Sequence, residues 1–152
     1  MRFIALDIGD VRIGVATCDS LEITASPAGT IHRVNNLKKD IASTAAIIVE
    51  QEADAIVAGL PLSLDGSAGP QAEKVLGFIR ALRRAVDIPV VTWDESLSSV
   101  EADELMISRG VSRQKRRVMI DQMAAVLILE GYLAHRRTAN TPSDVLQADA
   151  HQ

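Results

Sequence analysis

The sequence predicts an α/β fold in which a five-stranded sheet of mixed direction is flanked by about four helices. Two observations support this prediction. Three strand-like segments near the N-terminus are joined by short connections, and such connections favour an antiparallel meander. Helical and strand-like patterns then alternate along the chain, which is typical of parallel β-α-β units. We expect one domain over 1–137 and a flexible tail of polar and small residues over 138–152.

The first two strands and their turn lie in RFIALDIGDVRIGVA, residues 2–16. An apolar run carries Asp7 at its end, Gly9 supplies turn chemistry, and a second apolar run begins at Ile13. A third strand is expected over 30–34. Asp7 is unusual, because a carboxylate partly withdrawn from water would become protonated unless a cation lay nearby. The alternative is a turn-forming aspartate at a solvated strand end.

The later elements follow from apolar periodicity and from capping and turn residues. They are a helix over 37–52 capped by Asn35 or Asn36, with Leu37, Ile41, Ala45, Ile48 and Val49 on its apolar face, a strand over 55–60, a helix over 70–86, a strand over 90–93, a helix from Ser98 to before Gly110, and a long helix over 118–135. The first, fourth and fifth strands should form a parallel set. This arrangement places Asp7 and Glu95 near one edge of the sheet.

Composition restricts the class of protein. The chain is 47% apolar and 24% charged, and it shows neither a signal peptide nor an apolar run that could span a bilayer. We therefore expect a cytoplasmic protein with no membrane partner. The single cysteine, Cys18, excludes an internal disulfide and a multi-cysteine zinc site, and its position favours a core residue. A net charge of −4 argues against indiscriminate nucleic-acid binding but allows a locally basic surface.

Three carboxylates form the candidate active site, namely Asp7, Glu95 and Asp121. Asp121 shares a helix face with Ala124 and Ala125, two small residues that would let the helix approach the sheet closely. Its alternative role is that of an acidic residue near a helix start. Hard oxygen ligands of this kind select Mg²⁺ or Mn²⁺, and two such ions would serve in-line displacement at a phosphodiester. Asp94 is a weaker candidate, because its side chain points opposite to that of Glu95 in a strand.

Two segments are candidate nucleic-acid contacts. The segment over 109–117 carries five basic residues and no acid, which favours a flexible arm that binds phosphates over a solvated helix connection. The loop over 59–70, which includes Ser67, could present backbone N–H groups and a helix N-terminus to a phosphate, or simply connect strand and helix. The residues expected to contact nucleic acid are Arg12, Ser67, Arg113, Lys115, Arg116 and Arg117. Trp93 borders the site, but packing is its expected role.

Four motifs, in order, resemble those of the YqgF/RuvX family: DIGDVRIGVA, GLPLSLDGSAGPQA, DESLSSVEAD and IDQMAAVLIL. The resemblance covers about 2–133 and implies an RNase H-like fold, metal binding by Asp7, Glu95 and Asp121, and a nuclease that matures the 5′ end of pre-16S rRNA or resolves Holliday junctions. Two positions depart from the family pattern. Ser96 stands where the family commonly has arginine, and Val11 where a lysine or similar polar residue is common. Loss of the arginine would weaken phosphate binding more than metal binding.

Other functions stay open at this point. The first motif also resembles the phosphate motif of actin-like ATPases and sugar kinases. A non-catalytic ribosome-assembly factor that binds nucleic acid through a structural ion is a further alternative. The sequence does not distinguish an RNA precursor from branched DNA as the partner, or a monomer from a homodimer.

Overall fold

The computed structural model describes residues 1–138 apart from 20, 23, 64 and 95–112, and for 113–122 and 138 it describes the backbone alone. The elements in chain order are β1 (Phe3–Ile8), β2 (Arg12–Cys18), β3 (Ala25–His32), α1 (Leu37–Glu50), β4 (Ala55–Leu60), α2 (Pro70–Ala85), β5 (Val90–Asp94) and α4 (Arg113–Thr138). The helix predicted between Ser98 and Gly110 lies outside the described residues. None of the helices in the described part is both long and apolar enough to span a membrane.

The five strands form one sheet in the order β3-β2-β1-β4-β5. The pairs β1–β2 and β2–β3 are antiparallel, whereas β1–β4 and β4–β5 are parallel. The predicted fold class is therefore confirmed, including the parallel set made by the first, fourth and fifth strands.

The third strand begins and ends earlier than predicted. It spans Ala25–His32 rather than 30–34, and it pairs with β2 from Cys18 to Arg12. The strand includes Pro27 and Gly29, two residues that normally interrupt strands. Because β3 is the outermost strand, a proline without an N–H is tolerated there, and a register irregularity at Val15/Ala16 in the β2–β3 ladder accommodates the local distortion.

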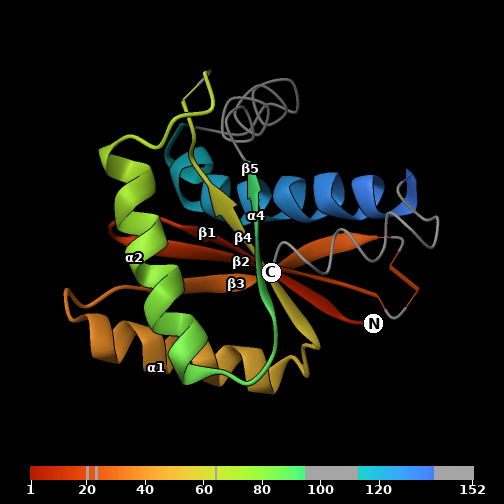
Figure 1. Cartoon of the computed structure of the whole chain (residues 1–152), viewed down its shortest axis with the longest axis horizontal. Coiled ribbons are helices and arrows are strands. Elements are labelled where there is room, and N and C mark those ends of the chain that lie inside the picture. The colour runs from red at the N-terminus through yellow and green to blue at the C-terminus, as the bar shows by residue number, and fades with distance from the viewer. Residues whose placement is uncertain (20, 23, 64, 95–112, 139–152) are drawn as a thin grey trace.

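Helices cover both faces of the sheet (Figure 1), with α1 and α2 on one face and α4 on the other. Side chains alternate between these two cores along β1. Ile4 and Leu6 are buried in the core with α1 and α2. Phe3 and Ala5 are buried in the core with α4. This alternation decides on which face a polar side chain of β1 emerges.

Helix α1 buries a narrower face than its apolar pattern predicted. Ile41 and Ile48 are buried, but Leu37 and Val49 are 50% and 75% exposed. The helix begins after Asn36, whose side chain accepts a hydrogen bond from the Lys39 N–H, so of the two predicted caps Asn36 is the one that is used. Leu37 is exposed because it is the first helical residue, and Val49 because it lies about 100° around the helix from Ile48.

The long C-terminal helix packs as predicted, although it begins earlier. Ala124, Ala125 and Ile128 are fully buried against the sheet. Cys18 is buried in the same core, which confirms its predicted packing role. Burial raises the pKa of its thiol, the charges of Glu22 and Asp19 add to this, and a hydrogen bond from the Phe3 N–H opposes it.

Candidate functional site

Asp7 lies inside β1, one residue before the strand ends, and is partly buried. By the alternation along β1 it belongs to the face that α4 covers, together with Phe3 and Ala5. Its partner across the β1–β2 ladder is Gly14. On the other side Leu6 pairs with Ala58, so Gly59, the next residue of β4, lies beside the same end of β1. Asp7 is therefore flanked by strand positions that carry no side chain.

The turn after Asp7 is narrow. The backbone N–H of Gly9 donates to the carbonyl of Arg12 over 2.9 Å. A Cβ at Gly9 would lie 2.7 Å from that same carbonyl oxygen, so only glycine fits there without movement of the backbone. Val11, at the tip, is 65% exposed. The turn thus holds Arg12 at the start of β2, close in sequence to Asp7.

A buried ion pair, which sequence reasoning missed, supports this turn. Arg33 follows β3, and its Nε donates to Oδ2 of Asp40 in α1 over 2.9 Å, with only 2% of the Asp40 side chain exposed. The Nη1 of Arg33 donates to the Gly9 carbonyl over 2.8 Å. Asp40 shares a helix face with Thr44 and Ile48, both buried. That i, i+4, i+8 spacing was the signal that an acidic residue lay on the buried face.

The electrostatics of Asp40 show how this charge is kept inside. Burial by itself raises the pKa of the carboxyl group, because it penalises the charged form. The hydrogen bonds from the Val34 N–H and from Arg33, together with the positive charge of Arg33, outweigh this effect and lower the pKa below its usual range. Asp40 is therefore ionised at neutral pH.

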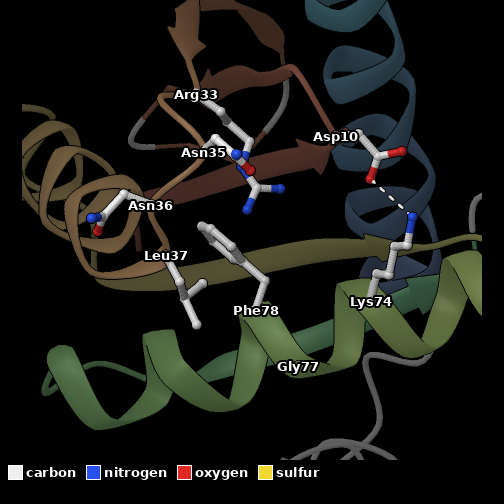
Figure 2. A pocket seen from close by; sticks show the side chains of 8 residues that line it. All are labelled: Asp10, Arg33, Asn35, Asn36, Leu37, Lys74, Gly77 and Phe78. Atoms are coloured by element: carbon white, nitrogen blue, oxygen red, sulfur yellow. Dashed lines mark ion pairs between the residues drawn. The ribbon is translucent and has the colours of Figure 1, made fainter.

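A pocket of about 670 Å³ opens beside this ion pair (Figure 2). Asp10 of the turn forms one side, and Lys74 of α2 reaches it with Nζ 3.8 Å from Oδ1. The guanidinium of Arg33 lies 5.0 Å from the ring centroid of Phe78. The β1–β2 turn is thereby contacted from α2 as well as from the segment before α1.

The strand β5 reaches the same edge of the sheet. Asp94 pairs with Leu60 and has the parity of Val90, which lies in the core with α1 and α2. Trp93 has the opposite parity and packs in the core with α4. Asp94 and Asp7 therefore lie on opposite faces, which agrees with the weaker rank predicted for Asp94. Glu95 lies outside the described residues.

Packing of Trp93 brings α4 close to this edge. Its ring meets Tyr132 edge-on, with centroids 6.0 Å apart, and His135 at 5.4 Å. A Cβ at Gly131 would lie 3.0 Å from the Trp93 Nε1. The predicted packing role of Trp93 is confirmed. His135 also takes part in this contact.

Asp121 lies in the described backbone of α4, three and four residues before the buried Ala124 and Ala125. Its side chain is not among those described. Among the residues whose side chains are described, no group of three or more His, Cys, Asp or Glu is arranged to hold a metal ion. Since Glu95 and Asp121 are outside that set, the three-carboxylate site stays a prediction.

The basic segment is helical where it is described. Arg113, Lys115, Arg116 and Arg117 form the first turns of α4, which corrects the predicted flexible arm over this part of the segment. The apolar period that marks the helix in the sequence begins only at about Val118, because the preceding turns are polar. The helix therefore begins five residues before its predicted start.

The loop before α2 is organised around Asp65. Its Oδ1 accepts hydrogen bonds from the N–H and the hydroxyl of Ser67, at 2.9 and 2.6 Å. These two bonds lower the pKa of the Asp65 carboxyl group. Helix α2 begins at Pro70 after Gly69, which offers no side-chain cap. Contact of Ser67 with nucleic acid stays a prediction.

The chain is similar to known proteins over most of its length. The family model described as "RuvX: Holliday junction resolvase" matches residues 1–135. A protein of Syntrophus aciditrophicus (strain SB) named "Putative pre-16S rRNA nuclease" is 42% identical over 149 residues, which cover 98% of this chain and 99% of the relative. A protein of the same name from Clostridioides difficile (strain 630) is 47% identical over 132 residues, or 87% and 93% of the two chains.

Two solved structures share the fold. RuvC of Thermus thermophilus in complex with a Holliday junction substrate gives a TM-score of 0.55 at 16% identity, over 90% of this chain and 96% of that one. The Holliday junction resolvase of fowlpox virus gives 0.54 at 14% identity, over 89% and 99%. At these identities the likeness shows the architecture alone.

Proposed function

The chain belongs to the family described as RuvX, Holliday junction resolvase, and we propose that it is a nuclease that hydrolyses phosphodiester bonds of structured nucleic acid with Mg²⁺ or Mn²⁺. The substrate we propose is a precursor of 16S rRNA, because relatives at 42% and 47% identity carry that substrate in their names. This activity would place the protein in ribosome biogenesis in the cytoplasm.

The position of Asp7 is the observation that carries the proposal. It is a partly buried carboxylate at the edge where β1, β4 and β5 end, on the face covered by α4. The residue opposite it, Gly14, leaves no side chain beside it at that register. The carboxyl ends of parallel strands are a common place for chemistry, and a divalent cation bound there would stabilise the charged form of such a carboxylate.

The proposed donor set fits a hard divalent cation. Asp7, Glu95 and Asp121 would hold it through oxygen atoms, without the histidine or cysteine ligands that zinc prefers. When bound, the ion supplies a water of lowered pKa and offsets the negative charge that develops on the phosphate. Pairing with Gly14 of β2 holds the backbone of Asp7 in place, and the β1–β4 ladder reaches the preceding residue, Leu6. The burial of Ala124 and Ala125 against the sheet supports a position of the nearby Asp121 close to it.

Basic side chains of the protein would bind the phosphate backbone of the substrate. Arg12 begins β2 next to the turn that follows Asp7. Arg113, Lys115, Arg116 and Arg117 belong to the first turns of α4, where the positive end of the helix dipole adds to their attraction for phosphate. Ser67 would contribute from the loop before α2. Such contacts read the backbone and its shape rather than the base sequence.

Cleavage assays with single carboxylate variants test the proposal. Labelled pre-16S rRNA leader, four-way DNA junction, duplex DNA and single-stranded RNA are incubated with Mg²⁺ or Mn²⁺. We expect wild type to cut the leader, and Asp7→Asn, Glu95→Gln and Asp121→Asn to lose at least about a hundredfold in rate without unfolding. Asp94→Asn, on the opposite face, and Asp87→Asn, an exposed residue before β5, are matched controls that should keep the rate.

The substrate that is cut decides between the alternatives. Cleavage of the junction in preference to the leader would favour a junction resolvase. Binding that weakens with salt but gives no turnover with either metal would favour a non-catalytic assembly factor and contradict the nuclease proposal. Full activity in all three carboxylate variants would contradict the proposed site.

A further inference from the structure

Arg33 makes two hydrogen bonds to the turn that follows Asp7. Its backbone N–H donates to the carbonyl of Val11 over 2.8 Å, and its Nη1 donates to the carbonyl of Gly9 over 2.8 Å. The N–H of Gly9 in turn donates to the carbonyl of Arg12. One residue thus holds the turn at two carbonyls.

Arg33 is itself held in place by α1. Its Nε donates to Oδ2 of Asp40, while Oδ1 of Asp40 accepts from the N–H of Val34, the residue after Arg33. Figure 2 shows the guanidinium beside the ring of Phe78, from which it lies 5.0 Å. A planar guanidinium that donates to a carboxylate and a carbonyl at once has its orientation fixed, unlike a flexible ammonium.

We propose that Arg33 is a positioning residue for the nuclease reaction, acting through the turn over 9–12 on Asp7 and Arg12. The inference rests on the proposed function, because it assigns the turn a role in holding a metal ligand and a phosphate contact. Gly9 is two residues after Asp7 and the carbonyl of Arg12 closes the turn, so a shift of the turn moves both side chains. Outer residues that orient metal ligands commonly change metal affinity or rate by about 10- to 100-fold.

The molecule contains a matched control at the other end of β1. Arg136 also donates from Nε to a carboxylate at 2.9 Å, that of Glu22, and its guanidinium also lies over a phenylalanine, 5.1 Å from the Phe3 ring. Its carboxylate partner lies on the β2–β3 connection, away from the turn over 9–12. Arg136→Ala therefore removes a similar set of interactions without touching the turn.

The experiment compares Arg33→Ala, Arg33→Lys and Arg136→Ala with wild type. Each protein is assayed for kcat, KM and the Mg²⁺ concentration that gives half-maximal cleavage, and for its thermal unfolding midpoint. Hydrogen exchange reports the Gly9 amide. We expect Arg33→Ala to lower kcat or raise the Mg²⁺ midpoint by about tenfold and to speed Gly9 exchange. Arg136→Ala should lower the unfolding midpoint but leave kcat and the Mg²⁺ midpoint unchanged.

Arg33→Lys keeps the inference testable if Arg33→Ala does not fold. Lysine retains the charge opposite Asp40 but cannot reproduce the fork to both partners, so stability should recover more than the Mg²⁺ midpoint does. Arg33 variants with wild-type kcat and metal midpoint, in a protein that cleaves, would overturn the positioning role and leave the nuclease function standing. A wild-type protein that cleaves none of the substrates would overturn the proposed function itself.

Discussion

Asp40 is the buried charge on which the support of the turn depends. A carboxylate with 2% of its side chain exposed loses most of its hydration. Charge-assisted hydrogen bonds from Arg33 and the Val34 N–H replace the lost water. Removing one partner of such a pair leaves the other charge without compensation, which is usually more harmful than never having had the pair. Arg33 and Asp40 therefore stabilise the fold as a pair, and the effect of replacing one depends on the other.

Substitution Asp40→Asn should reveal this charge through pH dependence. The folded pKa of Asp40 is lower than its unfolded value of about 3.9, so the carboxylate contributes stability that is present above that value and lost as pH falls through the folded pKa. At pH 7 we expect the variant to be less stable by about 3 kcal/mol. Urea unfolding of both proteins between about pH 7 and pH 2.5 should show the difference shrinking below about pH 4. A difference that stays constant with pH would contradict this account.

At the scale of elements, two helical glycines differ in what surrounds them. A Cβ at Gly77 in α2 would have its nearest contact at 3.9 Å, with the Arg80 side chain. A Cβ at Gly131 in α4 would meet the Trp93 ring at 3.0 Å. The same replacement by alanine therefore separates helix propensity from packing.

We expect Gly77→Ala to stabilise the protein by about 0.5–1 kcal/mol, because glycine loses more backbone entropy than alanine in a helix. Gly131→Ala should lack this gain, since the Trp93 ring must move by a few tenths of an ångström. Thermal unfolding measures the first effect. Fluorescence of Trp93, the single tryptophan of the chain, measures the second and should shift only in the Gly131 variant. If Gly131→Ala stabilised the protein as much as Gly77→Ala and left the Trp93 fluorescence unchanged, the expected steric conflict with the Trp93 ring would be contradicted.

Local patterns predicted the elements whose determinants lie within the element. The strand β4 and the start of α2 were predicted to the residue, because a continuous apolar run and a proline at the first helical position mark them. The strand β3 was misjudged, because tolerance of Pro27 depends on its edge position in the assembled sheet.

The site residues likewise fall into those that the local sequence could predict and those that depend on the assembled fold. Asp7 could be picked out because a carboxylate within an apolar run is visible in the sequence. The bond from Arg33 to the Gly9 carbonyl could not, because it joins residues 24 apart and depends on the register between β2 and β3. The helical spacing of Asp40, Thr44 and Ile48 was present in the sequence, but the buried face of the helix was predicted from its apolar residues alone.

At the scale of the whole molecule, two cores on opposite faces of one sheet each support a different part of the proposed site. The core with α1 and α2 supports the β1–β2 turn through Asp40 and Arg33. The core with α4 closes over the face to which Asp7 belongs. The proposed active site would lie at the end of the sheet that both cores reach, so a substitution in either core next to that end should reduce activity before it unfolds the protein.

The predicted domain limit, 1–137, can be tested by truncation. Among the residues whose side chains are described, Leu133 is the last buried member of either core, and Arg136 and Arg137 bind Glu22, through its carboxylate and its carbonyl oxygen respectively. A chain that ends after Arg137 should keep the full-length unfolding midpoint and cleavage rate. A chain that ends after His135 loses the partly exposed Arg136–Glu22 pair and should be less stable by about 1 kcal/mol. Calorimetry and the cleavage assay check both chains, and a lower midpoint for the 1–137 chain would show that residues 138–152 belong to the folded domain.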